Sequence, residues 1–274
     1  MLELPESATV ARQMTDMFAG RTVSLVEAAH TAHGFAFYSH DAEEYPSLLV
    51  GKTLDACVGV GGIVDATIED MHLALSEGVN IRHFEADAKP PKKYQFRMMF
   101  DDGSGFTCSV QMYGAMMVYP QGITDNSYYN VVFEKPSPLT DAFDRRYFDG
   151  IVESTEDKLS AKALLATQQR IPGLGNGVLQ DILFNAGIHP QRKLRDMDRS
   201  DFDALFASIK NTLAEMTERG GRDTDKDLFG NPGGYKTVLS TKTKNDPCPR
   251  CGGPITRKAY LGGNVYFCPA CQPL

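Results

Sequence analysis

Apolar and polar positions divide this chain into a first half that predicts short strands and a second half that predicts helices. In the first half, apolar residues alternate with polar ones, as in residues 106–112, and glycine-rich turns separate the segments. Strands without helices between them are typical of an antiparallel sandwich or barrel rather than a parallel sheet. Nine strands are expected, at residues 21–27, 35–39, 53–60, 63–68, 71–75, 80–85, 94–100, 106–112 and 115–119.

Helices are expected before and after these strands. Pro5 and Glu6 suit a first helical turn, because proline needs no amide partner there and acids favour the positive end of the helix dipole. Two prolines within residues 134–139 indicate a linker between domains. The polar, glycine-rich residues 222–234 predict a mobile loop. After the linker, helices are expected at residues 140–152, 160–169, 176–186 and 200–219.

Residues 168–190 predict the junction of two helices at a tight, glycine-rich turn. Pro172 and Gly173 end the first helix, because proline lacks an amide donor and glycine permits left-handed turns. Asn176 suits the N-cap of the second helix, and Gly187 ends it. The backbone amides of such a turn can face a phosphate group. On spacing alone, an ordinary helical hairpin is the favoured interpretation.

The composition is that of a globular protein, and it limits the cellular compartments and binding partners to be expected. Of the 274 residues, 42% are hydrophobic and 23% are charged, and no run of about 18 apolar residues could span a membrane. The first residues lack the basic and apolar regions of a signal peptide, so we expect a cytoplasmic protein. The net charge of −7 argues mildly against a nucleic-acid partner. Residues 236–274, however, carry six basic residues and one acid, a net +5 that leaves −12 elsewhere.

Four of the six cysteines form two Cys-x-x-Cys pairs near the C-terminal end. Cys248 and Cys251 are followed, after sixteen residues, by Cys268 and Cys271. Two such pairs can hold one tetrahedral zinc through four thiolates, and a site without an open position is structural. Two disulfides or free thiols are weaker interpretations for a cytosolic chain. We therefore expect one structural Zn²⁺ per chain, in a zinc-finger hairpin within residues 236–274.

Three segments, taken in order, resemble the formamidopyrimidine-DNA glycosylase / endonuclease VIII family. They are Glu-Leu-Pro-Glu at residues 3–6, Pro-Gly-Leu-Gly-Asn at residues 172–176, and the four-cysteine hairpin. The resemblance implies an α+β fold of two domains, with an N-terminal antiparallel β-sandwich at residues 1–134. The second domain would hold a helix–two-turns–helix motif at residues 135–235, followed by the zinc finger at residues 236–274. Damaged DNA would lie between the domains, with the lesion flipped out of the duplex.

The resemblance also implies the catalytic residues. In the family, the amine of an N-terminal proline attacks the sugar C1′, and the adjacent glutamate acts as general acid and base. Here Glu3 matches that glutamate and Glu6 matches a second acid, but Leu2 stands at the proline position. Because leucine is a poor context for removal of the initiator methionine, we expect the free amine to belong to Met1. The candidate catalytic residues are therefore Glu3, Glu6 and Met1.

Several DNA contacts of the family fall on different residue types in this chain. The family lysine that contacts phosphate and lesion falls on Gly62, and Lys52 need not replace it. The family arginine that clamps a phosphate falls on Gly263. Arg82 or Phe84 could stack in the vacated base position. The candidate DNA-binding residues are therefore Asn176, Gly175 and Asn264.

Three functional interpretations remain open. The favoured one is a base-excision-repair DNA glycosylase and AP lyase that binds double-stranded DNA with damaged or missing bases. Its catalysis would be altered by Leu2, with either water activated by Glu3 or the Met1 amine as the attacking group. The alternative is a catalytically inactive DNA-lesion-binding protein, because the family proline, lysine and arginine are all replaced. An RNA or protein partner would fit the acidic total. We expect a monomer, cytoplasmic and, in a bacterium, associated with the nucleoid.

Overall fold

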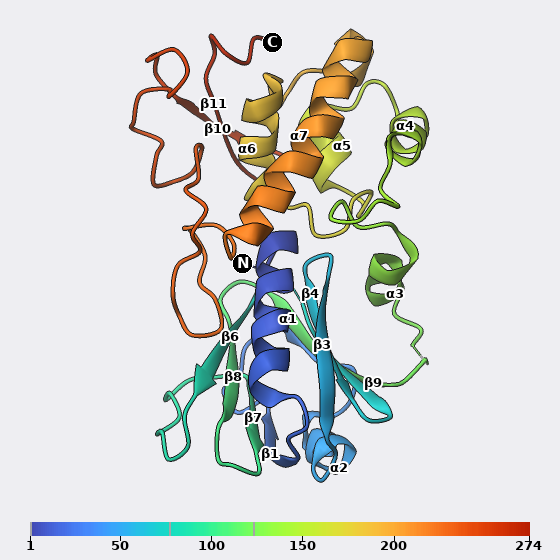
Figure 1. Ribbon diagram of the computed structural model, residues 1–274, viewed down its shortest axis with the longest axis vertical. Coiled ribbons are helices and arrows are strands. Elements are labelled where there is room, and N and C mark those ends of the chain that lie inside the picture. The colour runs from blue at the N-terminus through green and yellow to red at the C-terminus, as the bar shows by residue number, and fades with distance from the viewer. Residues whose placement is uncertain (1, 77, 123) are drawn as a thin grey trace.

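Two β-sheets form one end of the molecule and a group of helices forms the other (Figure 1). The computed structural model describes residues 2–76, 78–122 and 124–274. One sheet has the order β1-β7-β8-β6 and the other β2-β9-β5-β4-β3; their strands pair antiparallel, except that β2 runs parallel to β9. The strands are β1 (Val23–Ala28), β2 (Ala36–Phe37), β3 (Leu54–Val60), β4 (Ile63–Ile68), β5 (Met71–Leu75), β6 (Val79–Phe84), β7 (Phe96–Phe100), β8 (Gly105–Val110) and β9 (Gly114–Pro120).

Helix α1 (Leu4–Phe18) connects the two ends of the molecule (Figure 1). Its apolar face is buried in the N-terminal core, where Phe18 stacks on Phe100 with ring centroids 4.6 Å apart. At its other end, the amide of Leu4 donates to the carbonyl of Gly173, in the turn between two helices of the C-terminal half (2.9 Å). The first turn of α1 therefore lies where the two halves meet.

The helical half has its own core. Residues of α6 such as Ile182 pack with residues of α7 such as Leu213, while Tyr266 of the C-terminal hairpin belongs to a separate small cluster. The predicted α+β organisation is confirmed, and none of the described helices is long and apolar enough to cross a membrane. The elements of this half are α4 (Arg145–Glu153), α5 (Ala161–Ala166), α6 (Val178–Ala186), α7 (Arg199–Glu218), β10 (Thr256–Tyr260) and β11 (Gly263–Phe267), with a short 3₁₀ helix at Leu194–Asp196. Another short 3₁₀ helix, Ala42–Glu44, lies in the N-terminal half.

Two helices were not predicted from the sequence. They are α2 (Tyr45–Leu49) and α3 (Ser127–Glu134). Helix α3 contains tyrosine and valine residues that favour strands, but the side chain of Asn126 accepts the amides of Tyr128 and Tyr129 and caps a helix. Tyr129 is then buried against the five-stranded sheet, so the cap and this packing override the strand propensity.

The segment that follows α7, residues 219–236, returns from the helical half to lie beside α1 and β6 (Figure 1). Leu228 is fully buried in the N-terminal core, and its carbonyl accepts the amide of His83 (2.9 Å). Asp227 accepts a hydrogen bond from Gln13 of α1 (3.0 Å). The segment predicted as a mobile loop is therefore bonded to the N-terminal half at several points.

Candidate active site and nucleic-acid interface

A cleft of about 400 Å³ opens where the start of α1, the α5–α6 turn and the tip of the β10–β11 hairpin meet. Glu3 lines it together with Gly175 and Asn176 of the turn. Lys162 of α5 and Gly263 of the hairpin also line it. A further wall consists of apolar and aromatic side chains, those of Met112, Tyr113 and Tyr128. The fold thus places at one cleft three residues that the sequence analysis named separately: Glu3, Gly175 and Asn176.

The Glu3 carboxylate caps the N-terminus of α6, although Glu3 is itself the N-cap residue of α1. Its Oε1 accepts the amide of Gly177 (2.8 Å) and its Oε2 accepts the amide of Val178 (2.7 Å). Gly177, and not Asn176, is the N-cap residue of α6. Amides that were expected to face a phosphate therefore bind a carboxylate, an anion that the helix dipole favours. Burial raises the pKa of Glu3, against the opposing effect of the nearby Arg222.

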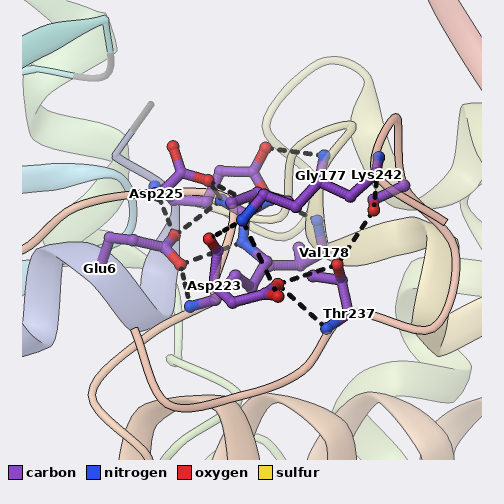
Figure 2. Close-up of polar contacts among 11 residues, drawn as sticks. Glu6, Gly177, Val178, Asp223, Asp225, Thr237 and Lys242 are labelled. Atoms are coloured by element: carbon purple, nitrogen blue, oxygen red, sulfur yellow. Dashed lines mark hydrogen bonds and ion pairs between the residues drawn. The ribbon is translucent and has the colours of Figure 1, made fainter. Parts of the chain in front are cut away.

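Arg222 is buried among three carboxylates, in the network drawn in Figure 2. Its Nε and Nη2 bind the two oxygens of Glu6 (3.0 and 2.8 Å), and its Nη1 lies 3.4 Å from Oε2 of Glu3. Asp225 adds a carboxylate oxygen 3.2 Å from Nη2. Burial alone would lower the pKa of Arg222, but the charges of Glu3 and Glu6 raise it above its ordinary value. Arg222 is thus a permanent cation behind the cleft.

Glycines in the α5–α6 turn make room for this buried ion pair. A Cβ atom on Gly177 would lie 1.5 Å from Nη1 of Arg222, and one on Gly175 would lie 2.6 Å from Oε1 of Glu3. A side chain at either position would displace the charged group behind it. The glycine-rich turn therefore fits an internal ion pair as well as a close approach of a ligand.

Glu6 and Leu2 have mainly internal contacts. An oxygen of Glu6 accepts the amide of Glu3 (3.3 Å), and Glu6 is not among the described residues that line the cleft. This position favours a structural role for Glu6 at the start of α1. Leu2 touches the edge of the cleft, but its side chain is buried in the N-terminal core with Val10 and others. Met1, the third candidate catalytic residue, lies outside the described residues.

Lys162 is a cleft residue that the sequence analysis missed. Its side chain is only 3% exposed, and its Nζ donates to the carbonyl of Tyr260 at the hairpin (2.6 Å). Burial lowers the pKa of Lys162. Lys52, by contrast, forms an ion pair with Asp70 and does not line the cleft. Lys162 escaped notice because its neighbours follow the apolar spacing of a core helix.

The two candidate wedge residues also lie apart from the described lining of the cleft. Arg82 donates through Nη1 to the carbonyl of Asp227 in the segment after α7 (3.1 Å). The ring of Phe84 lies beneath the guanidinium of Arg97, 5.0 Å from its carbon to the ring centroid. Both side chains are thus engaged in contacts within the N-terminal half or with the loop that covers it.

Asn176 and Asn264 are in direct contact across the cleft. Nδ2 of Asn176 donates to the carbonyl of Asn264 (3.1 Å), which also accepts Nε2 of Gln180 (3.0 Å). Asn176 is exposed, so its amide group can also reach a ligand. The turn and the zinc hairpin are therefore joined at the position where two candidate DNA-binding residues meet.

The four cysteines of the C-terminal hairpin form one cluster. All four sulfur atoms lie within 4.8 Å of one another, and two sulfur pairs are 3.8 Å (Cys248 to Cys271) and 3.5 Å (Cys251 to Cys268) apart. Zinc–sulfur bonds of about 2.3 Å in a tetrahedron place sulfur atoms about 3.8 Å apart, whereas a disulfide bond is about 2.05 Å. The residues thus fit one structural Zn²⁺, and the alternative of two disulfides is excluded. Backbone hydrogen bonds stabilise the turn at each Cys-x-x-Cys pair; for example, the amide of Cys248 donates to the carbonyl of Gly253 (2.7 Å).

Comparison with known proteins agrees with this geometry over the whole chain. Two family models match, the formamidopyrimidine-DNA glycosylase H2TH domain at residues 135–227 and the zinc finger found in FPG and IleRS at residues 245–274. The formamidopyrimidine-DNA glycosylase of Brevibacillus brevis is 28% identical, over 99% of both chains. A structure of Lactococcus lactis Fpg with DNA containing an abasic site matches with a TM-score of 0.85 and 25% identity, over 99% of this chain and 100% of that one.

A further structure, of Lactococcus lactis Fpg (MutM) with DNA containing an oxidized pyrimidine, matches with a TM-score of 0.84 and 26% identity, over 99% of this chain and 100% of that chain. The agreement spans the sheets, the helix–two-turns–helix segment and the zinc hairpin, which are the three parts that surround the cleft. The resemblance to the formamidopyrimidine-DNA glycosylase family is thus confirmed: this chain matches two domain models of the family and is similar to its members along its whole length.

Proposed function

We propose that this protein is a base-excision-repair enzyme, a DNA glycosylase and AP lyase that binds duplex DNA with damaged or missing bases. The observation that carries the proposal is the position of Glu3, which lines a cleft between the sheets, the α5–α6 turn and the zinc hairpin. A related protein with the same fold, Lactococcus lactis Fpg, was solved both with abasic DNA and with DNA that contains an oxidized pyrimidine. We also propose that residues 1–134, 135–235 and 236–274 act as the three parts of this site, in a monomer that is cytoplasmic and, in a bacterium, nucleoid-associated.

The attacking group must differ from the proline amine of the family, because Leu2 stands in its place and is buried. In one route, the Met1 amine attacks C1′ of the deoxyribose, the damaged base (or, at an abasic site, water) leaves, and the resulting imine permits elimination of the 3′ phosphate. In the other, Glu3 removes a proton from water that attacks C1′ as the damaged base departs, so no imine forms and the strand stays intact. Burial supports the second role, because it raises the pKa of Glu3 and so makes its carboxylate a stronger proton acceptor.

The second candidate function, a lesion-binding protein without catalysis, has an observation in its favour. Both oxygens of Glu3 already accept backbone amides of α6, and Arg222 lies 3.4 Å from one of them. A carboxylate held in this way is a better helix cap than proton acceptor. Binding would then depend on the cleft and hairpin, with Glu3 fixing their relative positions.

One experiment separates these possibilities. The full-length protein is incubated with duplex DNA that carries a single abasic site, with and without borohydride, and then with duplexes that carry oxidized bases. A covalent protein–DNA adduct supports the amine route, and peptide mapping by mass spectrometry then assigns the amine to Met1 or to Lys162. Base release without an adduct supports the water route. Binding without either product supports the lesion-binding protein, and failure to bind duplex DNA at low salt contradicts the proposed function.

A further inference from the structure

The cleft contains a side-chain amine that the proposed function does not yet use. Among the described residues that line it, Lys162 carries the only amine and Glu3 the only carboxylate. Leu2 occupies the position of the family nucleophile, and its side chain is buried. An amine that attacks the sugar must therefore come from another residue, and Lys162 is present at the same cleft as the candidate acid and base.

The Nζ atom of Lys162 lies at the tip of the zinc hairpin. It donates to the carbonyl of Tyr260, the last residue of β10 (2.6 Å). Tyr260 pairs with Gly263 across the turn, and residues 261–263 all line the cleft together with Lys162. The backbone carbonyl thus holds Nζ at a fixed point of the cleft wall.

The surroundings of Lys162 favour its neutral amine over the ammonium. The residue is 3% exposed, and apolar side chains such as Leu165 and Leu174 line the same cleft. Burial lowers the pKa of Lys162, and no carboxylate in the described part of the chain offsets this effect. A carbonyl oxygen orients Nζ but stabilises the ammonium less than a carboxylate would. Desolvation of this kind turns a lysine into a nucleophile for carbonyl groups.

We propose that Lys162 is the amine that forms the imine with an abasic sugar, and that Glu3 takes the C2′ proton in the elimination that follows. Neutral Nζ attacks the C1′ aldehyde; the carbinolamine takes one proton from solvent and loses its oxygen as water, which gives a protonated imine. Removal of the C2′ proton by Glu3 breaks the C3′–O bond and expels the 3′ phosphate. Water then hydrolyses the imine and releases Nζ.

The geometry of Glu3 is compatible with this step. Each of its two oxygens accepts one backbone amide, so each keeps a lone pair for a proton. The inference rests on the proposed function and deepens it, because it divides the two reactions between two side chains. Water activated by Glu3 releases the damaged base, and Lys162 then cleaves the strand at the abasic site. Neither reaction uses an amine at position 2, where this chain has leucine.

The test is borohydride trapping on duplex DNA with a single abasic site, followed by peptide mapping. In the wild-type protein, the adduct should map to the peptide that contains Lys162. Lys162→Arg keeps the charge and a donor for the Tyr260 carbonyl but has no nucleophilic amine. Adduct formation and strand cleavage should therefore fall by about a hundredfold or more, while affinity for the abasic duplex stays within about threefold of wild type.

Lys135→Arg is the matched control. The Nζ of Lys135 also donates to a backbone carbonyl, that of Gln169 (2.6 Å), but Lys135 is not among the described residues that line the cleft. This variant should form the adduct at the wild-type rate. Zinc content and circular dichroism verify that both variants fold. Base release from an oxidized duplex, measured after alkaline cleavage, should persist in Lys162→Arg, and its loss would overturn the division of the two reactions.

The remaining outcomes separate the inference from the proposed function. An adduct that maps to Met1, or wild-type adduct formation by Lys162→Arg, would overturn the inference and leave the proposed function intact. Base release by the wild-type protein without any adduct would do the same. Equal losses of affinity and of adduct in Lys162→Arg would also overturn it, since Lys162 would then only bind the duplex. If the wild-type protein binds no duplex at low salt, the proposed function and the inference fail together.

Discussion

At the scale of single residues, Glu3 combines a structural task with a candidate catalytic one. Replacing Glu3 by glutamine removes the charge that caps α6 and pairs with Arg222, so we expect a loss of stability of about 1–3 kcal/mol. If Glu3 is the proton acceptor, Glu3→Gln also abolishes base release, while binding of abasic duplex is retained. Thermal unfolding, duplex binding and a base-release assay on an oxidized duplex check these three outcomes.

Glu6 provides the matched control for this substitution. It is as buried as Glu3 and binds the same guanidinium, but it does not line the cleft among the described residues. Glu6→Gln should therefore destabilise the protein to a similar degree and leave base release measurable below its melting temperature. Full base release by Glu3→Gln, or its complete loss in both variants, would contradict the catalytic role assigned to Glu3.

The site was only partly predictable from residue types. Glu3, Asn176 and the four cysteines lie in short segments whose local chemistry is distinctive, so their importance was visible in the sequence. The importance of Arg222 was not visible, because it lies in a polar segment that resembles a mobile loop and its partners Glu3 and Glu6 are more than two hundred positions away. Lys162 was missed for a related reason: only the fold brings it to the cleft.

At the scale of elements, the zinc hairpin supports the nucleic-acid side of the cleft. Cys251 is exposed, so Cys251→Ser removes a zinc ligand with little loss of packing. We expect about one zinc per wild-type chain, loss of that zinc in the variant, and misfolding of the hairpin with loss of DNA binding. Metal analysis, circular dichroism and a binding assay measure these effects. Cys57→Ala, at a buried cysteine outside the cluster, should retain the metal; a metal-free wild-type protein that is fully folded would refute the zinc site.

The carboxylate of Asp65, which binds helix α3 to the five-stranded sheet, also binds a histidine whose charge depends on pH. Asp65 binds His72 Nδ1 and the Tyr129 hydroxyl of α3, both at 2.6 Å. The hydrogen bond to Asp65 raises the pKa of His72 above its ordinary 6.5, against a smaller effect of burial. The stabilisation is therefore complete below pH 6.5 and is lost as the pH rises through the raised, folded-state pKa.

The melting temperature should therefore fall as the pH rises, because His72 loses its proton. Between about pH 6 and pH 9, the wild-type protein should lose about 2 °C more than His72→Gln, whose side chain does not titrate. Differential scanning fluorimetry of both proteins across this range measures the difference. Parallel pH profiles for the two proteins would show that the Asp65–His72 contact does not contribute to stability.

The elements themselves show where sequence reasoning succeeds. All nine strands were predicted within a few residues, because each alternates in hydrophobicity and is bounded by glycine-rich turns. Helix α3 was missed because its composition favours a strand and only the Asn126 cap and the packing of Tyr129 select a helix. The start of α6 was placed at Asn176 instead of Gly177, because the group that caps this helix comes from Glu3, far away in the chain.

At the scale of the whole molecule, the ion-pair network joins parts that are distant in sequence. Residues 219–236 leave α7, contribute Arg222 to the acids of α1, and then bury Leu228 in the core between the sheets. Glu3 meanwhile connects α1 to the start of α6. The two halves are therefore coupled by one guanidinium and its carboxylates, in addition to packing between α1 and α7. We expect the wild-type protein to unfold in a single cooperative transition.

Removal of Arg222 should weaken this coupling more than any surface substitution. Arg222→Ala leaves the buried carboxylates of Glu3 and Glu6, and the partly buried one of Asp225, without their cation, so we expect a loss of about 3–5 kcal/mol and separate unfolding transitions for the two halves. Without the cation, the pKa of Glu3, already raised by burial, rises further, so the folded state of the variant binds more protons at this group than the unfolded chain does, and its stability decreases as the pH rises from about 4 to 7. Scanning calorimetry at several pH values measures both effects.

Arg222→Lys is the matched control. It keeps the charge but loses the bidentate contact with Glu6, so its stability should lie between those of the wild-type protein and Arg222→Ala. A single transition in Arg222→Ala, with wild-type stability at pH 7, would show that packing alone holds the halves together.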